Sequence, residues 1–175
     1  MTELEKMGAR ARAAAKTLRT ISADSKTTAL EAVASAIIEH ADTILSANAE
    51  DLTDAKANGM SESMQDRLLL TKERIGDMSA GVMAVSKWPD PVGKVLEEYD
   101  RPNGLHIKKV SVPLGVIGII FESRPNVTSD CAALCIRAGN VVILRGGKEA
   151  YRSNLAITKV MRKALTGAGL PEDCV

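Results

Sequence analysis

The hydrophobic pattern divides the chain into a helical front part and a rear part that alternates strands with helices. Up to Trp88, apolar side chains recur every three to four positions, which is the period of an amphipathic helix. The two clearest stripes are Leu4, Met7, Ala11, Ala14 and Leu18, and then Leu30, Val33, Ile37 and Ile38. Ser22 or Asp24 is the expected cap of the second helix. A third helix is predicted over 41–57, and shorter ones begin at Ser61 and Thr71.

The rear part contains apolar runs that are short enough to be buried strands. Residues 116–121 (VIGIIF) and 141–144 (VVIL) are rich in β-branched side chains, and a helical pattern lies between them and ends at Gly139-Asn140. Two buried strands joined by a helix predict a parallel βαβ unit with a right-handed crossover. Another helix is predicted behind Ser153 as its cap, and Cys174-Val175 is expected to start a third strand. Such a sheet is incomplete, so we expect further strands from outside these 175 residues.

A β-hairpin is predicted between the two parts. Residues 95–99 and 105–112 flank Asp100–Gly104, and Pro-Asn-Gly within that segment is strong turn chemistry. The hairpin mixes charged and apolar residues, so one face is expected to be wet. Two interpretations stay open: a contact between subunits, or an extra edge pair on the main domain.

Composition excludes several classes of function. The formal net charge is +1 and only 2% of residues are aromatic, which gives no support to nucleic-acid binding. The longest apolar run, 112–121, is too short to span a membrane, and the N-terminus lacks the apolar core of a signal peptide. Three cysteines without regular spacing indicate a reducing compartment. We therefore expect a cytoplasmic protein without membrane or nucleic-acid partners.

Two loops carry the candidate chemistry, because each follows a predicted parallel strand. Ligands of such sheets bind outside the carboxyl ends of the strands, so Glu122–Asn126 and Arg145–Lys148 should lie side by side. Gly146 and Gly147 let the backbone approach an anion, and Arg145 and Lys148 supply positive charge. These cations favour a nicotinamide cofactor with a 2′-phosphate, although Glu149 could weaken that preference. The alternative is a solvated turn with two surface cations.

The segment Ser123-Arg124-Pro125-Asn126 directly precedes a predicted helix. A helix N-terminus attracts anions and oxyanions, whereas the simpler interpretation is that Asn126 only caps the helix. Cys131 and Cys135 lie one turn apart on an apolar face, which favours core packing over metal binding or nucleophilic catalysis. His40 and His106 are isolated, and no metal site is predicted.

The segment VPLGVIGIIFESRPNVTSDCAALCIRAGNVVILRGGKEAYRSN, residues 112–154, resembles the γ-glutamyl phosphate reductases of the aldehyde dehydrogenase superfamily. The resemblance extends over the whole chain, including AEDL at 49–52, DRLLLT at 66–71 and the WPDPVG turn. It implies NADPH-dependent reduction of L-glutamyl 5-phosphate to L-glutamate 5-semialdehyde and phosphate, the second step of proline biosynthesis. A cysteine thiolate would attack the acyl phosphate, and the resulting thioester would accept hydride.

The resemblance also implies an α/β architecture in three parts. Residues 1–92 would be the N-terminal helical part of the cofactor domain, 93–112 an oligomerisation hairpin, and 113–175 an incomplete Rossmann-like βαβα part. The catalytic domain would lie outside this chain, because none of Cys131, Cys135 and Cys174 matches the family's nucleophile. The chain would then be inactive alone. Homo-oligomers through the hairpin and an association with glutamate 5-kinase are further expectations.

Residue roles follow from the same resemblance. In ordinary aldehyde dehydrogenases a Lys and a Glu after the second strand hold the adenosine ribose; here Arg145 and Lys148 occupy those positions. Glu122, Ser123, Gly146 and Gly147 complete the expected cofactor contacts. Either Asn126 contributes to the oxyanion site or Arg124 contacts the reacting group, and Arg124 could instead hold a substrate anion.

Two other functions stay open on the sequence. One is a free-standing nucleotide-binding or interaction module without catalysis. The other is a different acyl-phosphate or acyl-thioester reductase of the same superfamily.

Overall fold

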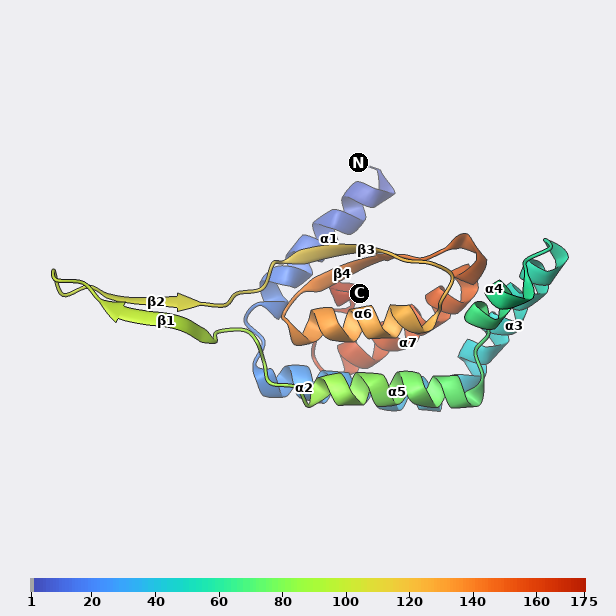
Figure 1. Ribbon diagram of the computed structural model, residues 1–175, viewed down its shortest axis with the longest axis horizontal. Coiled ribbons are helices and arrows are strands. Elements are labelled where there is room, and N and C mark those ends of the chain that lie inside the picture. The colour runs from blue at the N-terminus through green and yellow to red at the C-terminus, as the bar shows by residue number, and fades with distance from the viewer. Residues whose placement is uncertain (1) are drawn as a thin grey trace.

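Helices build the front part of the chain, as the hydrophobic period predicts. The computed structural model describes residues 2–175, and Figure 1 shows their arrangement. The front helices are α1 (Glu3–Leu18), α2 (Ala23–Glu39), α3 (Ala41–Ala57), α4 (Glu62–Leu68) and α5 (Lys72–Ser86). Ser22 caps α2 by accepting the Ser25 N–H, and Thr71 caps α5 by accepting the Arg74 N–H. Of the two proposed caps for α2, Ser22 is therefore the one used.

The buried stripe of the first helix is shorter than predicted. Ala11, Ala14 and Leu18 are buried, but Leu4 is 69% exposed. The start of α1 projects beyond the body, as Figure 1 shows, so no described element covers it. On α2, Ile37 is fully buried and Ile38 is 50% exposed, because the helix packs on α5 and α7 through a narrower face.

The rear part forms the predicted parallel pair. Strand β3 (Val116–Ile120) pairs in register with β4 (Val141–Arg145), from Val116 opposite Val141 to Ile120 opposite Arg145. Helix α6 (Asn126–Arg137) connects the strands, and α7 (Tyr151–Gly167) follows β4. Both α1 and α6 contact β4, and α7 packs against α2 and α3. The two loops that follow β3 and β4 therefore leave the sheet at one edge (Figure 1).

Within residues 2–175, β3 is less buried than β4. Val141 and Val142 of β4 are buried, whereas Ile120 at the end of β3 is 86% exposed. Within residues 2–175, β3 has a strand neighbour on one side only, which is β4. The apolar composition of β3 thus exceeds what the described part of the fold covers.

Two further boundaries differ from the prediction. Ser153 does not cap the last helix: a 3₁₀ turn, η1 (Lys148–Ala150), leads into α7, and Ser153 lies buried in its first turn. Residues Glu172–Cys174 form a second 3₁₀ turn, η2, where the start of a strand was expected. The predicted stop after α6 is confirmed, because Gly139 adopts φ +73° and the Asn140 N–H donates to the Cys135 carbonyl.

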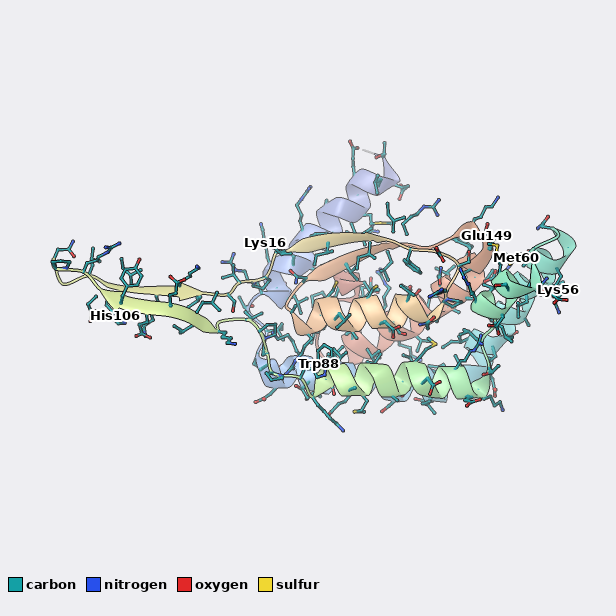
Figure 2. The ribbon with its side chains drawn as sticks, in the orientation of Figure 1. Lys16, Lys56, Met60, Trp88, His106 and Glu149 are labelled. Carbon is teal, nitrogen blue, oxygen red and sulfur yellow. The ribbon has the colours of Figure 1, made fainter. Side chains whose placement is uncertain are left out.

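The hairpin is a separate two-stranded sheet. Strand β1 (Val95–Asp100) pairs antiparallel with β2 (His106–Val110), and every residue of β1 is exposed. Figure 1 shows the hairpin projecting from the body, away from β3 and β4. This geometry removes the alternative of an edge pair on the main sheet. On its surface, the His106 ring lies 2.7 Å from both Glu98 and Asp100 carboxylates (Figure 2).

A buried ion pair holds the base of the hairpin. Lys26 of α2 has only 2% of its side chain exposed, and its Nζ lies 2.5 Å from the Asp90 carboxylate in the turn after α5. Asp90 also accepts the Val92 N–H at 2.9 Å. Next to this pair, Arg137 of α6 donates to the Trp88 carbonyl and to Thr27 Oγ1. Three segments far apart in sequence are thereby fixed where the hairpin leaves the body.

Candidate functional site

The loops after β3 and β4 are in direct contact, as the topology predicts. Ser123 Oγ donates a hydrogen bond to Glu149 Oε2 at 2.9 Å. The Phe121 N–H donates to the Arg145 carbonyl at 3.0 Å, which extends the strand pairing up to the loops. The prediction that 122–126 and 145–148 lie next to one another is therefore confirmed.

Packing explains why both loop glycines are needed. A Cβ on Gly147 would lie 2.5 Å from Ser123 Oγ, and a Cβ on Gly146 would lie 2.2 Å from Asn154 Nδ2 and 3.1 Å from the Phe121 ring. A side chain at either position would force Ser123, Asn154 or Phe121 to shift. The glycines thus permit the close packing at the junction of the two loops.

The cations of the second loop face different hollows. Arg145, Gly146 and Gly147 line a groove of about 390 Å³ between the sheet, α1 and α7, together with Thr128 and Asn154. Lys148 lines another hollow, beside α3 and α4, with Asp51, Asp54, Met60 and Glu149. The sequence placed Arg145 and Lys148 together, but η1 begins at Lys148 and turns it toward the acidic side of α3.

Glu149 brings a negative charge to the junction of the loops. Its pKa is held below the ordinary value by a hydrogen bond from its own backbone N–H and then by one from Ser123, with Lys148 adding a smaller attraction. Glu149 is therefore an ionised acceptor between the loops, a role that the sequence did not predict.

Asn126 is the first residue of α6 and does not cap it. Pro125 occupies the N-cap position without a side-chain hydrogen bond, and Asn126 Nδ2 donates instead to Asp130 Oδ2 at 3.1 Å. The interpretation of Asn126 as a simple helix cap is thus wrong. Arg124 is exposed, and Glu122 lies 3.7 Å from Arg67 of α4.

A buried polar network supports the second loop from behind. Asp51 of α3 is 2% exposed and accepts the N–H and the hydroxyl of Ser153 at 2.8 and 2.7 Å. It also accepts the Arg152 N–H at 3.3 Å, so Asp51 caps α7 from another helix. Asn48 donates to Ser153 Oγ and to the Leu68 carbonyl, and accepts the Leu70 N–H. The AEDL segment contains Asp51, but nothing local in it indicates this contact.

Burial disfavours the thiolate form of all three cysteines. Burial raises the pKa of Cys135 to about 11 and that of Cys174 to about 12, and burial followed by Asp130 raises that of Cys131. A thiol in this state supplies almost no thiolate at neutral pH. Within residues 2–175, no group of His, Cys, Asp and Glu side chains has the arrangement of a metal site. None of the helices described is long and apolar enough to cross a membrane.

Comparison with known proteins gives one consistent result. The chain is 51% identical over 173 residues to the γ-glutamyl phosphate reductase of Moorella thermoacetica, which covers 99% of the chain and 41% of that protein. It is 49% identical to the Heliobacterium modesticaldum protein of the same name, over 99% of the chain and 42% of the relative. The chain thus spans about two fifths of the length of these relatives.

Solved structures agree. The γ-glutamyl phosphate reductase of Thermotoga maritima superimposes with a TM-score of 0.97 at 40% identity, covering 99% of this chain and 42% of that one. The γ-glutamyl phosphate reductase of Saccharomyces cerevisiae superimposes with a TM-score of 0.93 at 33% identity, covering 100% of this chain and 46% of that one. The aldehyde dehydrogenase family profile matches residues 1–175. The chain therefore belongs to the aldehyde dehydrogenase family.

Proposed function

We propose that this chain is the N-terminal part of a γ-glutamyl phosphate reductase that uses NADPH to reduce L-glutamyl 5-phosphate to L-glutamate 5-semialdehyde and phosphate. The observation that carries the proposal is the contact between the two strand-end loops, Ser123 to Glu149, within a chain similar over 99% of its length to such reductases. Residues 1–92, 93–112 and 113–175 are the proposed helical, oligomerising and cofactor-sheet parts. The nucleophilic cysteine is expected in the remainder of the reductase.

The residues at the groove fit a phosphorylated dinucleotide. Gly146 and Gly147 leave backbone accessible, and the exposed Arg145 guanidinium provides a fork of donors for phosphate. When bound, NADPH supplies the hydride. Lys148 would supply positive charge for the 2′-phosphate, and Glu122 and Ser123 would contact the cofactor from the first loop. Asn126 would stabilise negative charge that develops on the reacting carbonyl oxygen through its amide N–H, and Arg124 would hold a substrate anion.

The free-standing module is less well supported. Leu114 and Ile120 are each 86% exposed, and the hairpin leaves Val95, Leu96, Leu105 and Val110 exposed as well. Apolar surface of this extent is typical of an interface. We propose that the hairpin joins copies of the reductase into a homo-oligomer. The association with glutamate 5-kinase, which would supply the acyl phosphate, stays a prediction. A cytoplasmic location, which is consistent with the three free cysteines, also stays a prediction.

The function is tested in a joined enzyme, which consists of residues 1–175 followed by the remaining sequence of the Moorella thermoacetica relative. We expect it to reduce NADP⁺ in the presence of glutamate semialdehyde and inorganic phosphate. The measurement is the increase in NADPH absorbance. The 175-residue chain alone should show no turnover. A folded joined enzyme without phosphate-dependent turnover, or turnover by the short chain, would contradict the proposal.

The cofactor preference is tested by Lys148→Glu in the joined enzyme. An acid at this position would repel the 2′-phosphate and could accept hydrogen bonds from a free ribose. We expect the ratio of kcat/KM for NADPH over NADH to fall by about tenfold or more, which corresponds to about 1.4 kcal/mol. Lys163→Glu, an exposed position on α7 that lines neither the groove nor the hollow of Lys148, is the matched control and should leave the ratio unchanged. An equal ratio in both variants would show that Lys148 does not select the cofactor.

A further inference from the structure

A polar hollow beside Asn126 is lined by charges of both signs. It lies between α4, α5 and the first turns of α6, and its volume is about 430 Å³. Arg67 and Arg74 line it together with Asp77, Asn126 and Asp130. It is distinct from the groove at Arg145, which lies toward α1 and α7. Mixed charge around one hollow suits a ligand that itself carries both charges.

Arg67 is the cation that a ligand can recruit. Arg74 is occupied, since it donates to the Asp66 and Leu69 carbonyls at 2.5 and 2.7 Å and to the Asp66 carboxylate at 2.9 Å. Among residues 2–175, the one carboxylate that pairs with Arg67 is that of Glu122, at 3.7 Å, and the two side chains are 50% and 75% exposed. Such an exposed pair contributes little to stability and can be exchanged for a ligand carboxylate. Because Glu122 belongs to the loop after β3, Arg67 lies over the same loop that leads to Asn126.

Asp130 is the complementary anion. Its Oδ2 accepts the Asn126 amide, and no Lys, Arg or His among residues 2–175 lies within ion-pair distance of its carboxylate. Burial raises the pKa of Asp130, opposed only by the Asn126 hydrogen bond. Removing a carboxylate from water without a cation costs free energy, which a ligand ammonium would offset.

We propose that this hollow binds the α-amino-carboxylate end of the amino-acid substrate, with Arg67 on the carboxylate and Asp130 on the ammonium group. The proposal rests on the proposed function, since it assigns the end of the substrate that does not react. Asn126 lines the same hollow and donates to Asp130. Its amide would face the reacting carbonyl, while Asp130, one turn further along α6, would hold the ammonium group. Arg67 and Asp130 are then the residues that select a glutamyl substrate over plain acyl phosphates.

Three aldehydes test the ammonium and the carboxylate group of the substrate separately. Each is assayed with the joined enzyme, NADP⁺ and phosphate. Glutamate semialdehyde carries both groups, 5-oxopentanoate lacks the amine, and 4-aminobutanal lacks the carboxylate. Arg67→Gln is expected to raise KM about tenfold or more for glutamate semialdehyde and 5-oxopentanoate, which carry the carboxylate, with kcat little changed. The KM for 4-aminobutanal should stay the same. Asp130→Asn should raise KM for glutamate semialdehyde and 4-aminobutanal, which carry the amine, and leave KM for 5-oxopentanoate unchanged. Lys72→Gln and Asp42→Asn remove exposed charges that do not line the hollow and should change none of the three.

The outcomes distinguish this inference from the proposed function. If the joined enzyme oxidises glutamate semialdehyde but Arg67→Gln changes KM equally for all three aldehydes, the assignment of the hollow is wrong and the function stands. If the enzyme prefers other aldehydes and ignores glutamate semialdehyde, the proposed function fails. Because Asp130 is partly buried, a thermal melt accompanies its variant; if Asp130→Asn unfolds, the exposed Arg67 variant decides the matter alone.

Discussion

Replacing Asp90 by asparagine is expected to lower the free energy of unfolding of the chain by about 3–5 kcal/mol, because it leaves the Lys26 ammonium buried without its carboxylate. Only 2% of the Lys26 side chain is exposed, so water cannot replace the lost partner. The measurement is urea denaturation followed by the fluorescence of Trp88, the one tryptophan in the sequence, two residues before Asp90.

A double-mutant cycle provides the control. Lys26→Met alone should cost less, since Asp90 is partly exposed and keeps the Val92 N–H. The double variant Lys26→Met/Asp90→Asn should recover much of the loss from Asp90→Asn, because no unpaired buried charge is left. Additive losses would show that the two side chains are not coupled.

The same pair gives a pH dependence of known sign. Burial alone would raise the pKa of Asp90, but hydrogen bonds from Lys26 and the Val92 N–H, together with the positive charges of Lys26 and Arg137, hold it below its ordinary value of 3.8. A carboxyl with a depressed folded-state pKa stabilises the fold fully above its unfolded value and loses that contribution as pH falls through the folded one. The stability difference between the unmodified chain and Lys26→Met should therefore shrink below about pH 4.

Asp51→Ala is the second substitution with a large expected effect. It removes the acceptor for the N–H groups of Arg152 and Ser153 and for the Ser153 hydroxyl, all at the start of α7. Loss of a helix cap together with an unsatisfied buried hydroxyl should lower the free energy of unfolding by about 3 kcal/mol. Hydrogen exchange should accelerate first at 148–155, because η1 and the first turn of α7 lose their support.

Asp54→Ala is the matched control for this experiment. Asp54 lies one turn further along α3 and also pairs with Arg152, at 2.8 Å, but its side chain is 58% exposed. An exposed pair is worth about 0–1 kcal/mol, so this variant should stay close to the unmodified chain. Equal losses from both variants would assign the effect to charge on α3 and not to the cap.

The sequence predicted features that depend on local periodicity or on chain topology. The order of the helices, the hairpin and the adjacency of the Ser123 and Glu149 loops belong to this group. The adjacency follows because a parallel βαβ unit brings consecutive strand ends to one edge. Prediction from the sequence failed where a contact joins residues that are far apart in the chain. Ser153 has the composition of a cap, but α7 is capped by Asp51, 102 residues earlier.

The candidate site shows the same division. Arg145 and Lys148 flank two glycines, so the sequence predicted one loop with two cations at the same site. The 3₁₀ turn begins at Lys148, and the two side chains line different hollows. Nothing in the sequence indicated that Arg67 and Asp130 line one hollow, since the hairpin lies between α4 and α6 in the chain. Side-chain direction at helix starts, unlike periodicity, is fixed by tertiary packing.

The cap donated by Asp51 has a consequence for the order of folding. Helix α7 has no N-cap side chain of its own, so its first turn acquires acceptors only after α3 has docked across a sequence separation of about a hundred residues. Contacts of such long range form late, because the chain between them must first lose its freedom. We expect the loop that precedes α7 to be among the last segments to reach its native shape, and a slow phase in refolding to report on Asp51.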